Sequence, residues 1–385
     1  MDIGLVFPGC HRRGGVERSV WEAARWFGTR HQVTVYASDY DGVGLPSEVR
    51  HMPVPAAGGL RTLPLFSAAV PRLLEGTTHD HVLSFGVADV PADVLWVNSV
   101  HRAWLDRSAQ FRGEGIRSSR LRRMLPHHRQ LLALERRYFT RLAHVSLVVV
   151  VADAVAADLE RLYRVPPELT RTVHNGFDPD EFSPERRPER AAARDELGLP
   201  ADCTVLLMVA NELPRKGYHV LLDAVARLGN PSVHVLLVGR TPPDQAMTSL
   251  AQRLGIDDRV HYGGSRTDMG RVHAASDLFV LPTKYEAFCL AIVESLGSGL
   301  PVVTTTVPGA GDVVQEGVNG LLQRDPGDAA ELAALLGRAL DPAVLADLRR
   351  RAAPSVADLT WSALFQRAES LLCEAGAGGI TRGES

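Results

Sequence analysis

One segment near the carboxyl end of the chain alternates between two kinds of apolar pattern. Residues 277–282 form a short apolar run closed by a proline, and residues 300–305 form a second such run. Both runs are typical of buried parallel strands. Between them, residues 290–296 carry apolar side chains at helical spacing, and Gly297 and Gly299 end that pattern. A strand, a helix and a second parallel strand form a βαβ unit, so this segment restricts the chain to an α/β fold.

The same alternation occurs in both halves of the chain. Further strands are predicted at residues 2–7, 33–37, 81–85, 94–97, 145–151, 204–210, 233–239 and 260–262. A chain of 385 residues is long for one core, so we expect two Rossmann-like domains whose parallel sheets face an interdomain cleft. An Asn-Gly turn at Asn175 and the charged residues 184–190 mark the boundary. We place the domains at residues 1–182 and 183–355, followed at 356–385 by a last helix that crosses back to the first domain and a glycine-rich tail.

Composition narrows the class of protein further. The formal net charge of −3 gives no general attraction to nucleic acid. No stretch approaches the ~18 apolar residues of a membrane span, and Asp2 and Gly4 are atypical of a signal peptide. We therefore expect a cytoplasmic protein. The cysteines lack the spacing of metal ligands and are expected to be free thiols; they are Cys10, Cys203, Cys289 and Cys373.

Two carboxylates belong to the segment described first. Glu286 falls in the loop after residues 277–282, and Glu294 lies about one turn inside the following helix. In open α/β sheets, ligands bind beyond the carboxyl ends of the strands, where helix N-termini present N–H groups that suit phosphate. Ionised carboxylates only accept hydrogen bonds, so they suit sugar hydroxyls. A nucleotide-sugar combines both kinds of group, whereas a glutamate taken alone is more often a solvated residue at a helix start.

The sequence around these glutamates resembles a known family. Glu286 lies in Tyr-Glu-Ala-Phe-Cys, and Glu294, eight residues later, begins Glu-Ser-Leu-Gly-Ser-Gly-Leu-Pro-Val-Val. Together they resemble the E-x7-E signature of the retaining family 4 glycosyltransferases. The resemblance implies the GT-B fold. The seven residues from Asn211 to Gly217 are most similar to those of hexosyltransferases that build bacterial cell-surface glycans such as the lipopolysaccharide core.

A basic pair follows the predicted strand 204–210. Arg215 and Lys216 stand just before Gly217 at the start of a helix, where their cationic groups suit a diphosphate. Family members usually show Gly-Arg a few residues earlier, and this chain has Ala210 and Asn211 there. The chain thus departs from the family by one positive charge.

The resemblance also implies roles for residues elsewhere in the chain. The glycine-bearing loop after residues 2–7 would contact donor phosphate and acceptor through Gly14, Gly15 and Val16. His101, after residues 94–97, would contact the transferred sugar. The base would be held by the turn that contains Gly263 and Ser265, and the diphosphate by Asn211 and by the N–H groups of Ala287, Phe288, Cys289 and Leu290. Glu294 would accept from the ribose and Glu286 from the transferred sugar.

The function expected from these features is retaining transfer of a hexose from a nucleoside-diphosphate sugar, with a UDP-sugar favoured. The acceptor would be a hydroxyl of a glycan, glycolipid or secondary metabolite. Catalysis would need no metal or other cofactor, although Asp39-Tyr-Asp41 has the D-x-D form of metal-dependent transferases. The alternatives are a GDP-mannose-dependent mannosyltransferase and a non-catalytic nucleotide-sugar binder. A dinucleotide-dependent dehydrogenase is disfavoured because G-x-G-x-x-G is missing.

A basic amphipathic segment spans residues 111–141. Its leucines and basic residues suit the anionic inner face of the cell membrane or a phosphorylated acceptor, and a solvated arginine-rich surface is the alternative. The arginines are Arg112, Arg117, Arg120, Arg122, Arg123, Arg129, Arg136, Arg137 and Arg141, against Glu114 and Glu135.

Overall fold

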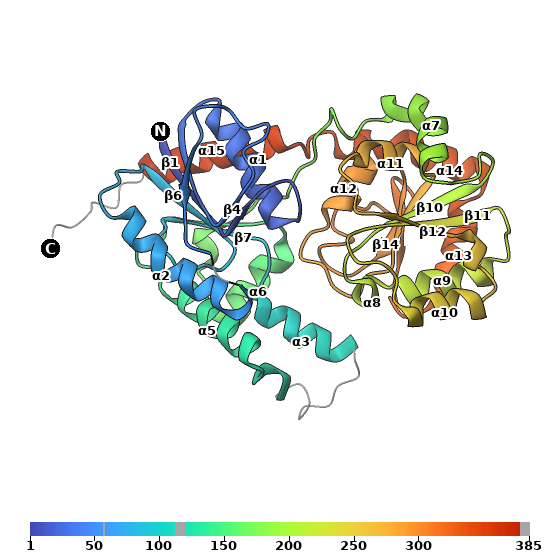
Figure 1. Ribbon diagram of the computed structural model, residues 1–385, viewed down its shortest axis with the longest axis horizontal. Helices are drawn as coiled ribbons and strands as arrows, with labels where there is room; N and C mark the ends of the chain where they lie inside the picture. The colour runs from blue at the N-terminus through green and yellow to red at the C-terminus, as the bar shows by residue number, and fades with distance from the viewer. Residues whose placement is uncertain (57, 112–120, 378–385) are drawn as a thin grey trace. The chain divides into compact units, whose positions relative to one another are not determined.

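The computed structural model describes residues 1–56, 58–111 and 121–377, which form two compact units (Figure 1). Unit 1 comprises Met1–Asn175 and the chain from Trp361 onward, and unit 2 comprises Gly176–Thr360. Each unit contains a fully parallel sheet, of seven strands in unit 1 and six in unit 2. The α/β architecture with two Rossmann-like domains is therefore confirmed.

The order of strands in the unit 1 sheet reverses beside its first strand. Its order is β5 (Arg50–Pro53), β3 (Gln32–Ala37), β1 (Asp2–Val6), β6 (His81–Phe85), β7 (Val94–Val97), β8 (Leu147–Val150) and β9 (Thr170–Thr172). Ligands of such sheets bind at the point where the strand order reverses, here between β1 and β6. The helices are α1 (Val16–Gly28), α2 (Thr62–Leu74), α3 (His101–Phe111), α5 (Pro126–Thr140), α6 (Asp153–Tyr163) and α15 (Trp361–Ala377).

The order of strands in the unit 2 sheet also reverses once. Its order is β12 (Val260–Gly264), β11 (Val233–Val238), β10 (Thr204–Val209), β13 (Leu278–Leu281), β14 (Val302–Thr305) and β15 (Gly320–Gln323), with the reversal between β10 and β13. The helices are α7 (Arg190–Glu196), α8 (Leu213–Lys216), α9 (Tyr218–Leu228), α10 (Gln245–Arg253), α11 (Met269–Ala275), α12 (Leu290–Gly297), α13 (Ala329–Ala339) and α14 (Pro342–Ala352).

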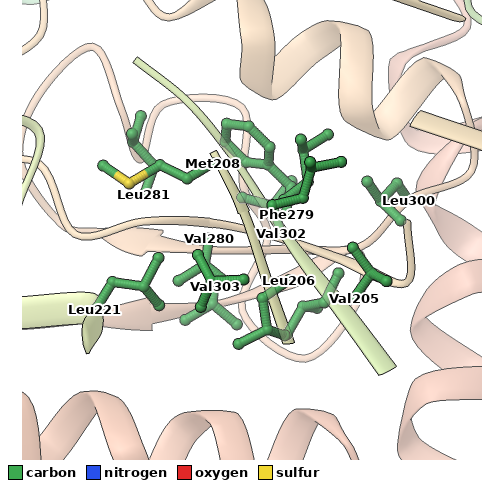
Figure 2. Packing of buried hydrophobic residues seen from close by; sticks show 14 of the residues in the cluster. Val205, Leu206, Met208, Leu221, Phe279, Val280, Leu281, Leu300, Val302 and Val303 are labelled. Carbon is green, nitrogen blue, oxygen red and sulfur yellow. The ribbon is translucent and has the colours of Figure 1, made fainter. Parts of the chain in front are cut away.

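The central strands of unit 2 are buried on both faces, as their continuous apolar runs predict. Figure 2 shows side chains of β13 and β14 packed with those of β10 and with Leu221 of α9. All four residues of β13 and all four of β14 are buried. This core holds β10 and β13 in fixed register, with Leu206 beside Leu278 and Leu207 beside Phe279.

The last helix belongs to unit 1. Phe365 of α15 is fully buried, and its ring centroid lies 5.6 Å from that of Phe27 in α1 and 5.8 Å from that of Trp96 in β7. Just before this helix, Leu359 O accepts the backbone N–H of Phe177 at 3.0 Å, so the first and last residues of unit 2 lie side by side.

One buried carboxylate holds several segments of unit 2 together. Asp277, 7% exposed, stands just before β13 and accepts from Arg187, Arg190, Arg194 and Arg349 at 3.3, 2.7, 2.9 and 3.2 Å. We call these five residues the Asp277 cluster. Burial opposes ionisation of Asp277, but hydrogen bonds from Arg190 and the Val205 N–H, with the arginine charges, lower its pKa overall. The cluster thus fastens residues 187–194 and α14 to the amino end of the sheet.

The arginine-rich segment is partly a structural element. Arg122 donates to Leu105 O at 2.9 Å, and Arg123 donates to Asp106 at 2.5 Å, so both residues fasten the chain to α3. Arg129, Arg136, Arg137 and Arg141 are exposed. Arg112, Glu114, Arg117 and Arg120 lie outside the described residues, as does the tail from residue 378. Among the helices that the structure describes, none is long and apolar enough to cross a membrane.

Candidate active site

The loop after β13 presents Glu286 at the carboxyl edge of the unit 2 sheet. Thr283 begins the loop by donating its hydroxyl to Glu286 Oε1 at 3.0 Å, and Thr305 of the neighbouring strand donates to Thr283 O at 2.9 Å. Gly309 packs against the same loop with φ +81°, and a Cβ there would lie 2.5 Å from Ala287 O. The Glu286 carboxylate is only 7% exposed, and these contacts hold it in a fixed place.

The loop after β10 brings two cations to that carboxylate. Lys216 Nζ lies 2.5 Å and Arg215 NH1 lies 3.1 Å from Glu286 Oε1. The short helix α8 ends at Gly217, whose φ of +79° is accessible to glycine and where a Cβ would lie 2.1 Å from Pro282 O. The close approach of the two loops therefore depends on glycine at this position.

The Arg215 guanidinium makes contacts on two sides. NH1 also donates to Tyr285 O at 2.5 Å, while Nε and NH2 donate to the two oxygens of Glu212 at 3.0 and 3.1 Å. Burial alone would lower the pKa of Arg215, but the charges of Glu286 and Glu212 raise it, so the group is a permanent cation. Glu212 was not among the residues that the sequence singled out, because a glutamate before a short helix is an ordinary surface residue.

The start of α12 lies beside this group. Cys289, the residue before the helix, is buried, and its thiol is within electrostatic range of Lys216, Glu286 and Glu294. Burial raises the pKa of Cys289 to about 11, so the thiol is neutral. Its backbone N–H donates to Gly309 O at 3.1 Å, so this N–H is already used within the protein. Ala287 and Phe288 precede Cys289, and Leu290 is the first residue of α12, so these residues lie at a helix start, where N–H groups point toward an anion.

Other expected donor-site residues lie along the same edge of the sheet. Asn211, after β10, accepts the backbone N–H of Arg240 on Oδ1 at 2.8 Å. Gly239 packs against the end of β10, and a Cβ there would lie 2.0 Å from Ala210 O. Gly263 ends β12 together with Gly264, and Ser265 follows it. The predicted residues after β12, β10 and β13 therefore share one edge of unit 2.

Unit 1 carries the remaining predicted residues at the carboxyl ends of its strands β1 and β7. Gly14 has φ +116°, and Gly15 and Val16 begin α1 directly after the loop that follows β1. His101 begins α3 after β7, and its Nε2 lies 3.0 Å from His128 Nδ1. Burial, followed by the charges of His128, His127 and Arg122, lowers the pKa of His101 to about 4. The imidazole is therefore neutral at physiological pH.

A buried carboxylate that the sequence did not reveal as special positions His101. Glu135 in α5 is fully buried and accepts the backbone N–H groups of His101 at 2.5 Å and Arg102 at 3.0 Å. Tyr163 donates its hydroxyl to the same carboxylate at 2.5 Å. Because Leu134, Tyr138 and Phe139 of α5 are buried as well, helical spacing alone could have placed Glu135 on the buried face.

The D-x-D sequence has a structural explanation. Asp39 lies 3.2 Å from His11 Nε2 and 3.9 Å from Arg13 NH2, and Asp41 accepts the Val43 N–H at 3.1 Å. Within the part of the chain that the structure describes, no group of three His, Cys, Asp or Glu residues is placed to hold a metal ion.

Two parallel-sheet units, with basic and acidic side chains at the carboxyl edge of the second, define the GT-B class of fold. Residues 13–181 match the family Glycosyltransferase Family 4, and residues 189–354 match Glycosyl transferases group 1. The chain is a family 4-type glycosyltransferase with the GT-B fold.

Individual relatives agree with this class. The lipopolysaccharide glucosyltransferase WaaG of Escherichia coli is 28% identical over 335 residues, which cover 85% of this chain and 86% of WaaG. A D-inositol 3-phosphate glycosyltransferase of Saccharomonospora viridis is 36% identical over 57% of this chain, which spans about half (53%) of that relative.

Solved structures cover almost the whole chain. A crystal structure of WaaG, a glycosyltransferase involved in lipopolysaccharide biosynthesis, superimposes with a TM-score of 0.80 at 25% identity and covers 99% of this chain and 100% of WaaG. Sucrose-phosphate synthase of Thermosynechococcus elongatus reaches 0.79 at 21% identity, over 98% of this chain and 100% of that one, and shows the shared fold.

Proposed function

We propose that the protein transfers a hexose from a nucleoside-diphosphate sugar to an acceptor hydroxyl with retention of the anomeric configuration. The observation that carries the proposal is the contact of Arg215 and Lys216 with Glu286 beside the start of α12. Such a site offers cations and helix N–H groups to a diphosphate and a carboxylate to sugar hydroxyls.

The contacts of Glu286 assign its two oxygens different tasks. Oε1 accepts from Thr283, Arg215 and Lys216, so the carboxylate is held by one oxygen. We assign Oε2 to a hydroxyl of the transferred sugar. Glu294, buried in α12 near the Cys289 thiol, accepts from the ribose hydroxyls in this proposal.

The leaving group is stabilised by charge. As the bond between the anomeric carbon and the phosphate oxygen breaks, negative charge grows on the diphosphate, where Lys216, Arg215 and the first turn of α12 counter it. The acceptor oxygen forms its bond to the anomeric carbon on the face that the phosphate leaves, and its proton passes to the departing phosphate oxygen. This route retains the configuration, and none of its steps requires a metal or other cofactor.

Unit 1 provides the acceptor side in this proposal. His101, neutral and oriented by Glu135 and His128, contacts the transferred sugar, and Gly14, Gly15 and Val16 allow a phosphate or acceptor to approach the backbone. The acceptor class is a hydroxyl of a glycan, glycolipid or secondary metabolite, in keeping with the lipopolysaccharide substrate that the name of WaaG gives.

UDP-hexose is the favoured donor. WaaG is named a glucosyltransferase, and HepE of Anabaena, which shares the fold at 23% identity, has been crystallised with UDP-glucose. A GDP-mannose-dependent mannosyltransferase and a non-catalytic nucleotide-sugar binder on the same fold are the alternatives.

A thermal-shift screen against a panel of nucleotide-sugars tests the donor, because a ligand that binds only the folded protein raises Tm. We expect UDP-hexoses to give the largest increase, and a larger increase with GDP-mannose would select the mannosyltransferase. Glu286→Ala should abolish transfer while the far-UV spectrum and Tm transition persist. Turnover that survives within a few-fold would contradict the role of Glu286, and donor binding without transfer or hydrolysis would favour the binder.

We also place the protein in the cytoplasm, in peripheral contact with the membrane. Leu121, Met124 and Leu125 are exposed by 66, 64 and 46%, and Leu65 of α2 by 45%. Between α2 and α5, a groove of about 690 Å³ is lined by Arg61, Pro126, Arg129, Gln130, Leu132 and Ala133. Exposed leucines beside arginines suit an anionic lipid surface.

Sedimentation with phosphatidylglycerol vesicles tests this contact. Replacing Leu121 and Met124 with serine should reduce the bound fraction several-fold. Val43→Ser, at a residue 80% exposed elsewhere in unit 1, is the matched control and should leave it unchanged. Equal binding by all three proteins would remove the membrane from the proposal.

A further inference from the structure

The Arg215 guanidinium is almost fully occupied before any ligand arrives. Nε and one N–H of NH2 donate to the two oxygens of Glu212, while NH1 donates to Tyr285 O and Glu286 Oε1. A guanidinium has five N–H donors, and these contacts use four of them. The side that Glu212 covers is the paired Nε and NH2 edge, which matches two oxygens of a phosphate as well as those of a carboxylate.

The two sides of the guanidinium differ in how firmly they are held. Glu286 is 7% exposed and is fixed by Thr283 as well, so the NH1 side belongs to the buried part of the site. The Glu212 side chain is 60% exposed, and it stands before α8 without a capping hydrogen bond from its side chain. Exposed carboxylate–arginine pairs contribute little to stability, so exchanging Glu212 for another anion costs little.

We propose that Glu212 occupies the place of the donor diphosphate on Arg215 and leaves when the nucleotide binds, so that its carboxylate lowers the affinity for donor and product. This inference rests on the proposed function, because it takes the diphosphate as the ligand of Arg215. A diphosphate carries more negative charge than one carboxylate, which allows it to displace Glu212 from the fork. After displacement the Glu212 carboxylate remains close to the phosphates and repels them, which favours release of the nucleoside diphosphate product.

The opposite role predicts the opposite sign. If Glu212 instead served to hold Arg215 in the orientation that phosphate needs, removing its charge would weaken binding. The sign of the change in affinity therefore distinguishes competition from support.

Isothermal titration of the full-length protein with inorganic pyrophosphate and with UDP tests the proposal. We expect Glu212→Gln to bind both ligands about three- to tenfold more tightly than the wild type, because one exposed negative charge is removed near the phosphates. Uridine, which has no phosphate, should bind the two proteins equally. In an Arg215→Gln background, the gain from Glu212→Gln should fall below about twofold, since the competition for Arg215 is gone.

Asp223→Asn is the matched control. Asp223 forms the same two-point contact with Arg227 in α9, at 3.0 and 3.3 Å, and both residues are exposed. This variant carries the same change in net charge and should leave both affinities unchanged.

Four results would overturn the proposal: weaker or equal binding by Glu212→Gln, an equal gain in Asp223→Asn, an equal gain without Arg215, or no pyrophosphate binding by any variant. Binding of pyrophosphate without binding of any nucleoside diphosphate would instead refute the proposed function. Competition for Arg215 would then still be decided by the pyrophosphate titrations.

Discussion

Replacing Asp277 with asparagine tests whether the Asp277 cluster stabilises unit 2. The substitution keeps the size of the side chain but removes the only negative charge that the four arginines share in the cluster. Breaking a buried ion pair by removing one partner costs about 3–5 kcal/mol. Arg187 and Arg349 are each about one-third exposed (38 and 33%), and carbonyls of residues 274–276 also accept from Arg187 and Arg190. We therefore expect Asp277→Asn to lower the free energy of unfolding by about 3 kcal/mol, the lower end of this range.

Thermal and urea unfolding of the full chain provide the measurement. For a unit of this size, 3 kcal/mol corresponds to a decrease in Tm of about 6–12 °C. The transition to follow is that of unit 2, which a nucleotide ligand should shift separately from that of unit 1. The exposed pair Asp223–Arg227 again provides the control, and Asp223→Asn should change the free energy of unfolding by less than about 0.5 kcal/mol. A loss below about 1 kcal/mol in Asp277→Asn would show that the arginines are satisfied by carbonyls and water alone.

Three further variants test individual contacts. Gly217→Ala should destabilise unit 2 by more than about 2 kcal/mol and abolish nucleotide binding, because the new Cβ would overlap Pro282 O at a φ of +79°. Gly255→Ala is the control, since Gly255 has a φ of +66° and a Cβ there would meet nothing within 4 Å. This variant should cost about 1 kcal/mol in the same denaturation assay. Glu135→Gln should destabilise unit 1 by about 1–3 kcal/mol and speed hydrogen exchange at the start of α3, since the charged acceptor of the His101 and Arg102 N–H groups is lost; unchanged exchange would refute this role. Burial lowers the pKa of His273 to about 4, so the folded state keeps this imidazole neutral, and the free energy of unfolding should fall as pH decreases from about 6.5 to 4. His273→Gln should reduce this dependence of stability on pH in unfolding titrations. An unchanged pH dependence would contradict the assignment.

The sequence predicted the central strands of both sheets and missed the edge strands β5, β9 and β15, whereas the edge strand β12 was predicted at residues 260–262. β13 and β14 have continuous apolar runs and were predicted within two residues at each end. β5 and β9 are edge strands with mostly exposed or half-buried side chains, so no apolar run marks them. The helix α2 was missed because it lies in a region rich in glycine and proline and contains Pro71 in its last turn.

The candidate site also has a part that the sequence predicted and a part that it missed. Arg215, Lys216 and Glu286 come together because they follow adjacent parallel strands, and strand adjacency is predictable from the βα pattern. Contacts made by single polar residues between distant segments are not predictable in this way. Glu135 caps a helix that begins 34 residues earlier in the sequence, and Glu212 becomes notable only once its two contacts with Arg215 are seen.

The two ends of β13 carry similar chemistry with different consequences. Asp277 before the strand and Glu286 after it are both buried carboxylates that contact basic side chains. At the amino end, Arg187, Arg190 and Arg194 also donate to backbone carbonyls, so these arginines bond within the protein and serve stability. At the carboxyl end, Glu212 is the exposed member of the group, and the start of α12 adds N–H groups that attract anions. Asp277→Asn should therefore lower stability with little change in pyrophosphate affinity, and Glu212→Gln should raise that affinity with little change in stability.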